Sequence, residues 1–149
     1  MSRGWALAIV SLVIGAFAVA ALAIVVISTN DTVVVELDPG DCFELPDDID
    51  DEIGMVDTTD CDDEHEAEVV AAGELDPERD LDYPADESVA MAERRCNVDV
   101  GDDPAIVTDF GILPVVANEQ AWEPLAGRYV CVAIPYGGGT TSGSLLDDA

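Results

Sequence analysis

The residues best suited to chemistry lie between Cys61 and Val70, where the chain reads CDDEHEAEVV. This stretch holds the single histidine of the chain, His65, four residues after the second of four cysteines. A histidine that acts as a general base needs a nucleophile or an acid within hydrogen-bond reach. The hydroxyls considered as nucleophiles lie in the glycine-containing C-terminal segment, which contains Thr140, Thr141, Ser142 and Ser144. Such a segment is predicted to be too flexible for catalysis. We therefore expect His65 to hydrogen-bond backbone in the turn after Cys61.

The four cysteines have two conventional uses, disulfides and zinc. They are separated by 18, 34 and 34 residues, and no C-x-x-C or H-x-x-x-H pair accompanies them. Zinc sites ordinarily draw ligands from closely spaced pairs, so this spacing does not favour zinc. An even number of cysteines in a small exported domain predicts two disulfides. Spacing alone leaves three connectivities open for Cys42, Cys61, Cys96 and Cys131.

Two acidic runs offer oxygen ligands for calcium, one from Asp47 to Glu52 and one from Asp57 to Asp63. Neither has the alternating acids, the glycine and the distal glutamate of a calcium-binding loop. We expect a hydrated acidic surface that binds cations weakly and nonspecifically. No specific metal site and no cofactor are predicted.

Charge limits the partners of the chain. No acid precedes Asp31, so all 33 acids lie in the remainder, together with four arginines and no lysine. That region carries a formal charge of about −29 (4 minus 33). Such a charge excludes nucleic-acid binding through a phosphate-neutralising surface and opposes contact with anionic lipid headgroups. Cationic partners, metal cations or a salt-rich environment fit it better.

The N-terminal region is predicted to be a membrane anchor. Ala6 to Ile27 is an uncharged run of 22 residues. As a helix it extends about 33 Å, enough to cross a hydrocarbon core of about 30 Å. Arg3 precedes the run and acids follow it, so the positive-inside rule leaves residues 1–5 cytoplasmic. The alternative is a cleaved signal peptide, since small-x-small sites occur at Ala16–Ala18 and Ala21–Ala23. Both interpretations place residues 30–149 outside the cytoplasm.

The remaining residues predict one α+β domain, 28–136, followed by a flexible tail, 137–149. Short β-branched or alternating segments indicate a mainly antiparallel sheet. Pro114 places one of these segments at a sheet edge, and 66–72 is expected to be central. The expected strands are 32–37, 42–45, a short one around 55–56, 66–72, 110–116 and 128–134. In the last of these, Tyr129, Cys131 and Ala133 share one face, and Val130, Val132 and Ile134 share the other.

One principal helix is predicted at about 86–97. Asp86 is the expected N-cap, and Arg94 and Arg95 fall in the expected last turn, where their charges suit the helix dipole. Helical spacing relates Val89, Ala92, Arg95 and Cys96, so Cys96 is expected to face the core from the last turn. A second, single helical turn is expected after Asn118, which caps it and leads to Trp122.

Several short motifs, taken in order, cover nearly all of residues 36–146. They are Gly40-Asp41-Cys42-Phe43, Cys61-x-x-x-His65-x-x-Glu68-Val69, a helix ending at Cys96, Glu119-x-x-Trp122, the strand cysteine Cys131 and Gly143-Ser144-Leu145. Together these motifs resemble the septum formation family of exported actinobacterial proteins. The proline that precedes the histidine in the family is replaced here by Glu64, and the segment after Trp122 is longer than in the family.

The resemblance implies a membrane-anchored or secreted domain of the cell envelope, linked by family name to septation, with no established catalytic activity. By the order of its motifs it also implies pairing of Cys42 with Cys61 and of Cys96 with Cys131.

Two function classes follow. The first is a non-enzymatic, single-pass membrane module that binds an envelope protein or a cell-wall component, with candidate binding residues His65, Glu68, Trp122 and Arg128. The second is a hydrolytic or metal-dependent wall enzyme that uses His65. An enzyme should show a pocket around His65 with a second titratable group in reach. A binding module should show a grooved surface with an exposed apolar patch. A salt-adapted spacer is a third possibility.

Overall fold

A computed structural model of the chain describes residues 31–47 and 54–146. Four predicted parts of the chain lie wholly or mostly outside this range. They are the cytoplasmic segment 1–5, the membrane span 6–27, most of the acidic run 47–52 and the last three residues of the tail. Among the described residues, no helix has the length and apolar character that a membrane span requires.

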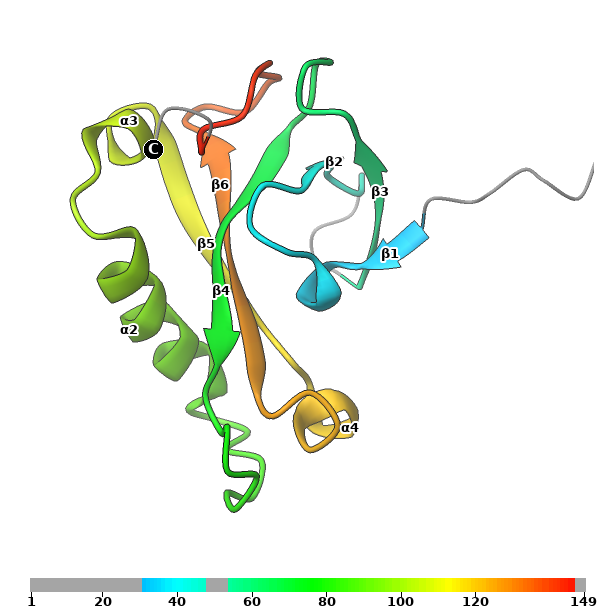
Figure 1. The fold of residues 1–149 in the computed structure, drawn as a ribbon, viewed down its shortest axis with the longest axis vertical. Coiled ribbons are helices and arrows are strands. Elements are labelled where there is room, and N and C mark those ends of the chain that lie inside the picture. The colour runs from blue at the N-terminus through cyan, green and yellow to red at the C-terminus, as the bar shows by residue number, and fades with distance from the viewer. Residues whose placement is uncertain (1–30, 48–53, 147–149) are drawn as a thin grey trace, which may run out of the picture.

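The described residues form a small α+β domain around one six-stranded antiparallel sheet, as the sequence predicted (Figure 1). The strand order is β1-β3-β2-β4-β6-β5, so the β4 segment is central, as expected. The strands are β1 Asp31–Val33, β2 Cys42–Glu44, β3 Met55–Thr59, β4 Ala67–Glu74, β5 Phe110–Val116 and β6 Arg128–Pro135.

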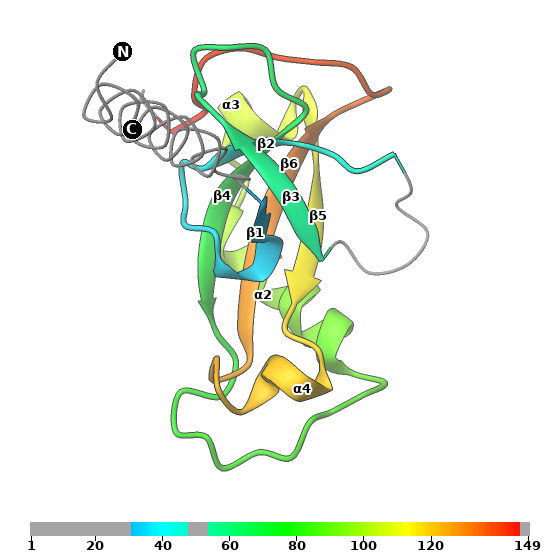
Figure 2. The same ribbon diagram turned by 90° about the vertical axis from the view of Figure 1, so that its right-hand side faces the viewer.

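The sheet separates two apolar cores. Figures 1 and 2 show α2 (Ser88–Val100) on one side of strands β4, β6 and β5, with β1 and β3 on the other side. Alternation along β6 supplies both cores, because successive side chains of a strand point to opposite faces. Val130 and Val132 enter the core beneath β1 to β3, whereas Tyr129, Cys131 and Ala133 pack toward α2. The predicted assignment of faces in this strand is confirmed for these residues.

The principal helix lies later in the chain than predicted. It spans Ser88–Val100, and its N-cap is Glu87, whose side chain makes no capping hydrogen bond; Asp86 is therefore not the cap. Arg94 and Arg95 consequently lie mid-helix and not in the last turn. The buried face consists of Ser88, Ala92 and Cys96, whereas Val89 and Arg95 are exposed. The small residues at i, i+4 and i+8 let the helix approach the sheet closely.

Only the first part of the predicted strand 32–37 is a strand in the structure. β1 ends at Val33, and Val34–Glu36 form a 3₁₀ turn, η1, closed by a hydrogen bond from Leu37 N–H to Val34 O at 3.2 Å. Continuation of the strand would leave Val34 and Val35 on opposite faces. In the turn, both valines are buried.

Two smaller predictions are confirmed and one element was missed. The sheet ends at β5, the strand that contains Pro114. Asn118 caps α4 (Glu119–Trp122) by accepting from Ala121 N–H at 3.0 Å. The sequence analysis did not predict the short helix α3, Pro104–Val107, where Asp103 accepts from Ala105 N–H and proline occupies the first turn.

Two disulfides cross-link the domain in the pairing that the resemblance implied. Cys42–Cys61 joins β2 to the β3–β4 turn, and Cys96–Cys131 joins α2 to β6. All four cysteines lie within the described residues, and none is free.

The described residues of the predicted tail, 137–146, include several that make hydrogen bonds to the β3–β4 turn. Thr141 and His65 exchange backbone hydrogen bonds of 2.8 and 2.9 Å, and Gly143 N–H donates to Cys61 O. Three consecutive glycines with positive φ, at 137–139, turn the chain back toward the β3–β4 turn. Residues 141–146, which we call the C-terminal strap, therefore belong to the domain.

Candidate functional site

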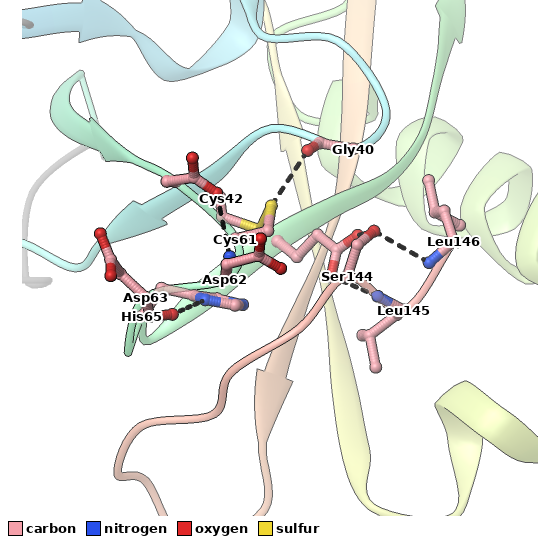
Figure 3. The surroundings of a disulfide bond; sticks show 11 residues. Gly40, Cys42, Cys61, Asp62, Asp63, His65, Ser144, Leu145 and Leu146 are labelled. Carbon is pink, nitrogen blue, oxygen red and sulfur yellow. Dashed lines mark hydrogen bonds between the residues drawn. A yellow bond between two sulfur atoms is a disulfide. The ribbon is translucent and has the colours of Figure 1, made fainter. Parts of the chain in front are cut away.

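The turn at Gly40 and Asp41 fixes the first disulfide against β4. Gly40 adopts a φ of 97°, which glycine tolerates without steric cost. Its N–H donates to Val69 O at 2.8 Å, and Val69 N–H donates to Asp41 O at 2.9 Å. Cys42 follows immediately and bonds to Cys61 (Figure 3). The two family-like motifs thus meet in space.

His65 is fully buried beside this disulfide. Its Nδ1 lies 3.0 Å from the carbonyl oxygen of Asp63, in the turn after Cys61 (Figure 3). A carbonyl oxygen only accepts, so Nδ1 carries a proton, and in the neutral ring Nε2 then presents its lone pair. The expected hydrogen bond to backbone is confirmed. Nε2 is buried and has no hydrogen-bond partner among the described residues.

Glu68 is the second buried titratable group of the region, with 1% of its surface exposed. Ser144 donates its hydroxyl to Glu68 Oε1 at 2.7 Å, and Leu145 N–H donates to Oε2 at 2.8 Å. Two donors satisfy the carboxylate, as burial of a charge requires. Glu68 therefore fastens the C-terminal strap to β4 and is not exposed for binding.

His65, Glu68 and Cys42 form one cluster. A ring nitrogen, a carboxylate oxygen and a sulfur from these residues lie within 4.8 Å of one another. Cys42 is bonded to Cys61, so its sulfur is not the thiolate that metal ligation requires. In the disulfide state only the histidine and the carboxylate have ligand character.

The cavity beside this cluster does not give His65 access to a substrate. It has a volume of about 530 Å³ and lies between the Gly40 turn, the β3–β4 turn and the C-terminal strap. Cys42, Cys61 and Ser144 contribute to its wall. His65 does not line it and is fully buried. The arrangement expected of a His65-dependent enzyme is therefore absent from the described residues.

Trp122 and Arg128, two further candidates from the sequence, have structural contacts. Trp122 is 2% exposed, donates its indole N–H to Leu81 O at 3.3 Å and stacks edge-on against Tyr83. Arg128 donates Nε to Val35 O at 2.8 Å. Its Nη2 donates at 2.9 Å to Leu37 O and at 2.8 Å to Asp38 Oδ1. Both side chains hold segments of the domain together.

A second hollow has the apolar character of a binding surface. It is a groove of about 390 Å³ along the second half of β5, which we call the β5 groove. One wall comes from Val33 and Val35, and the other from the start of α2, including Val89. Val33 and Val89 have 38% and 57% of their surfaces exposed. The full lining is Val33, Val35, Gly54, Tyr83, Ala85, Ser88, Val89, Leu113, Pro114, Val115, Val116, Asn118 and Ala121.

The backbone of β5 turns alternate peptide groups toward the edge of the sheet. Tyr136 N–H donates to Asp109 O at 2.9 Å, and Ala117 N–H donates to Arg128 O at 2.8 Å. Alternate residues of an antiparallel pair bond the neighbouring strand, so the odd-numbered residues of β5 face β6. Pro114 belongs to the other set, where its missing N–H costs no bond to β6.

The even-numbered residues Ile112 and Val116 therefore direct their peptide groups away from β6. Among the described strands, β5 pairs only with β6. The second half of β5 thus combines an edge with backbone donors and acceptors and an apolar groove. The sequence indicated the edge through Pro114, but it did not indicate the groove, whose walls come from three distant segments.

Comparison of the chain with protein-family models, with curated proteins and with solved structures finds no significant match. The likeness to the septum formation family stays a prediction from the motifs.

Proposed function

We propose that this chain is a membrane-anchored, extracytoplasmic module of the cell envelope that has no catalytic activity and binds an extended segment of an envelope protein in the β5 groove. The observation that carries the proposal is the coincidence of an apolar groove with a sheet edge along β5. The anchor is the predicted span Ala6–Ile27, and the resemblance of the motifs to septum formation proteins supports a partner at the division site.

The shape of the groove suits a peptide that joins the sheet as an additional strand. In this mode, main-chain hydrogen bonds supply affinity, and alternate side chains of the peptide enter pockets. Ile112 and Val116 offer the main-chain groups, while Val33 and Val89 offer the apolar contact. Pro114 removes one donor from the edge, which limits pairing with arbitrary strands.

Charge selects among such peptides. The region from Asp31 onward carries about −29, from 33 acids and four arginines. An opposite charge on a partner accelerates encounter and disfavours acidic competitors. The partner segment should therefore carry apolar residues in alternation, flanked by lysine or arginine.

The alternative, a wall enzyme that uses His65, has less support. Its histidine is buried, and the hydroxyl of Ser144 is committed to Glu68 at 2.7 Å. A nucleophile and a base must face a space that the substrate can enter.

The test is selection of peptides from a random display library on the full chain in detergent micelles. We expect enrichment of alternating apolar sequences with basic flanks. Val89→Gln should weaken binding of the enriched peptides about tenfold, because burial of one valine contributes roughly 1.5 kcal/mol or more. Val98→Gln is the matched control, since Val98 is an exposed valine of the same helix outside the groove.

Two results would oppose the proposal. One is the absence of any enriched class of peptides. The other is equal binding of the enriched peptides by the Val89→Gln and Val98→Gln chains, which would place the contact elsewhere on the molecule.

A further inference from the structure

We propose that reduction of the Cys42–Cys61 disulfide opens a zinc site formed by the Cys42 thiolate, His65 Nε2 and the Glu68 carboxylate. This inference concerns a different part of the molecule from the β5 groove and does not depend on the proposed function.

The donor set is one that zinc accepts. Zinc is bound in proteins by thiolate, imidazole and carboxylate, in a tetrahedral arrangement. Bonds of about 2.0 to 2.3 Å place neighbouring ligand atoms roughly 3 to 4 Å apart. A ring nitrogen of His65, a carboxylate oxygen of Glu68 and the sulfur of Cys42 already lie within 4.8 Å of one another. A small inward movement therefore suffices to form the site.

His65 is prepared for ligation in the way that metal-bound histidines usually are. A ligating imidazole normally donates its other N–H to a carbonyl or carboxylate, which fixes the tautomer and the ring orientation. Here Nδ1–H donates to Asp63 O at 3.0 Å. The lone pair of Nε2 is buried and lacks a hydrogen-bond partner among the described residues. A buried polar atom without a partner is costly, and a metal ion would satisfy it.

Glu68 keeps capacity for a metal while it holds the strap. An ionised carboxylate has about four lone-pair positions. Ser144 and Leu145 occupy one on each oxygen. These two donors would orient the carboxylate as outer-shell partners of the ion.

The disulfide controls the site because it withholds the thiolate. A dithiol reductant can approach through Cys61, which lines the 530 Å³ cavity and is half-buried. A thiolate of the reductant attacks Cys61 Sγ, the S–S bond breaks, and Cys42 leaves as a thiolate. The second reductant thiolate then attacks the mixed disulfide and releases Cys61. The reductant becomes a cyclic disulfide and supplies two electrons and two protons.

The surroundings suit both products of this reaction. Cys61 Sγ lies 3.2 Å from Gly40 O, which can accept a hydrogen bond from the new thiol. Zinc takes the place of the Cys42 proton, which passes to solvent. Cys42 also contributes to the wall of the cavity, whereas His65 and Glu68 do not. Cys96 and Cys131 are 2% and 0% exposed, and this burial protects the other disulfide.

Two variants of the full chain, each with one cysteine replaced by serine, test the inference in detergent without a reductant. Cys61→Ser leaves Cys42 as a free thiol beside His65 and Glu68. Cys42→Ser is the matched control, since it has the same acids and one free thiol but lacks the buried sulfur. Zinc affinity is measured by competition with a chromophoric chelator, and cobalt is substituted to detect thiolate ligation by its charge-transfer absorption.

We expect the Cys61→Ser chain to bind one zinc ion at least tenfold more tightly than the Cys42→Ser chain does. A further His65→Gln substitution should abolish that difference. The cobalt form of the Cys61→Ser chain should show the thiolate band.

Any one of three results would overturn the inference and assign the binding to surface acids. These are equal zinc affinity of the two variants, absence of the thiolate band, and zinc affinity that is unchanged by His65→Gln. If circular dichroism shows that the Cys61→Ser chain is unfolded, the unsubstituted chain is reduced with a dithiol. Zinc should then protect Cys42 from alkylation, and unchanged alkylation would overturn the inference.

Discussion

Tyr129 shows how the environment of one side chain sets its chemistry. It lies near the start of β6 with 4% of its surface exposed, and its hydroxyl donates to Asp99 Oδ2 on α2. Burial is the largest cause that raises the pKa of Tyr129 to about 12, and the hydrogen bond and negative charge of Asp99 raise it further. Arg95 opposes this shift in pKa.

This shift predicts loss of stability in alkali. A pKa that rises from 10.0 in the unfolded chain to about 12 in the folded one means that the folded state binds the proton more tightly. The stabilisation is fully present below pH 10 and declines as the pH rises toward 12. The two-unit shift corresponds to about 3 kcal/mol of unfolding free energy. Urea unfolding of the full chain in detergent at increasing pH measures it.

Tyr129→Phe provides the control, because phenylalanine does not ionise. Its unfolding free energy should fall less between pH 10 and pH 12 than that of the unsubstituted chain, with the disulfide content checked by mass in each sample. Parallel curves for the two chains would show that Tyr129 is not responsible.

Several residue roles followed from residue type and neighbours, and others required the fold. His65 bonds backbone in its turn, as its place after Cys61 suggested. The burial of Glu68 and its bond to Ser144, 76 residues away, have no local signal. The spacing of the cysteines and the histidine did not indicate the proposed zinc ligands either. One ligand comes from β2, one from the β3–β4 turn and one from β4, so the fold and not the sequence brings them together.

Hydrophobic alternation located the strands because each has to serve one or two apolar cores. It failed at the ends of elements, where tertiary contacts decide. β1 stops at Val33 because Val34 and Val35 both find burial in η1. The principal helix begins at Ser88, two residues beyond the predicted cap, since its buried face starts with Ser88 itself. The β5 groove was not predictable, because no single stretch contains its walls.

Arg128 joins two elements, η1 and β6, across 91 to 93 residues of sequence. Arg128→Lys should destabilise the domain by roughly 2 kcal/mol, because one ammonium cannot replace the planar fork and charged hydrogen bonds contribute about 1.5 to 3 kcal/mol. Urea unfolding of the full chain in detergent gives the measurement. Arg79→Lys is the control, since Arg79 is exposed and makes one long contact of 3.5 Å. Equal stability of the two variants would contradict the role assigned to Arg128.

At the scale of the whole molecule, unbalanced negative charge is the dominant electrostatic feature. Among the described residues, the ion pair between Arg128 and Asp38 is the one salt bridge. The other acids among the described residues have no ion-pair partner there. Self-repulsion of this kind destabilises a compact state and is reduced by salt.

Stability should therefore rise with ionic strength. The screening length falls from about 10 Å at 0.1 M salt to about 3 Å at 1 M. Because 33 acids face four arginines beyond residue 30, repulsion between neighbouring acids exceeds attraction over that range of distances. The thermal unfolding midpoint of the full chain should increase in sodium chloride and by the same amount in potassium chloride. Sucrose, which stabilises by exclusion and not by screening, separates the two causes. A midpoint that responds to sucrose and is flat in both salts would show that the charges are already compensated within the fold.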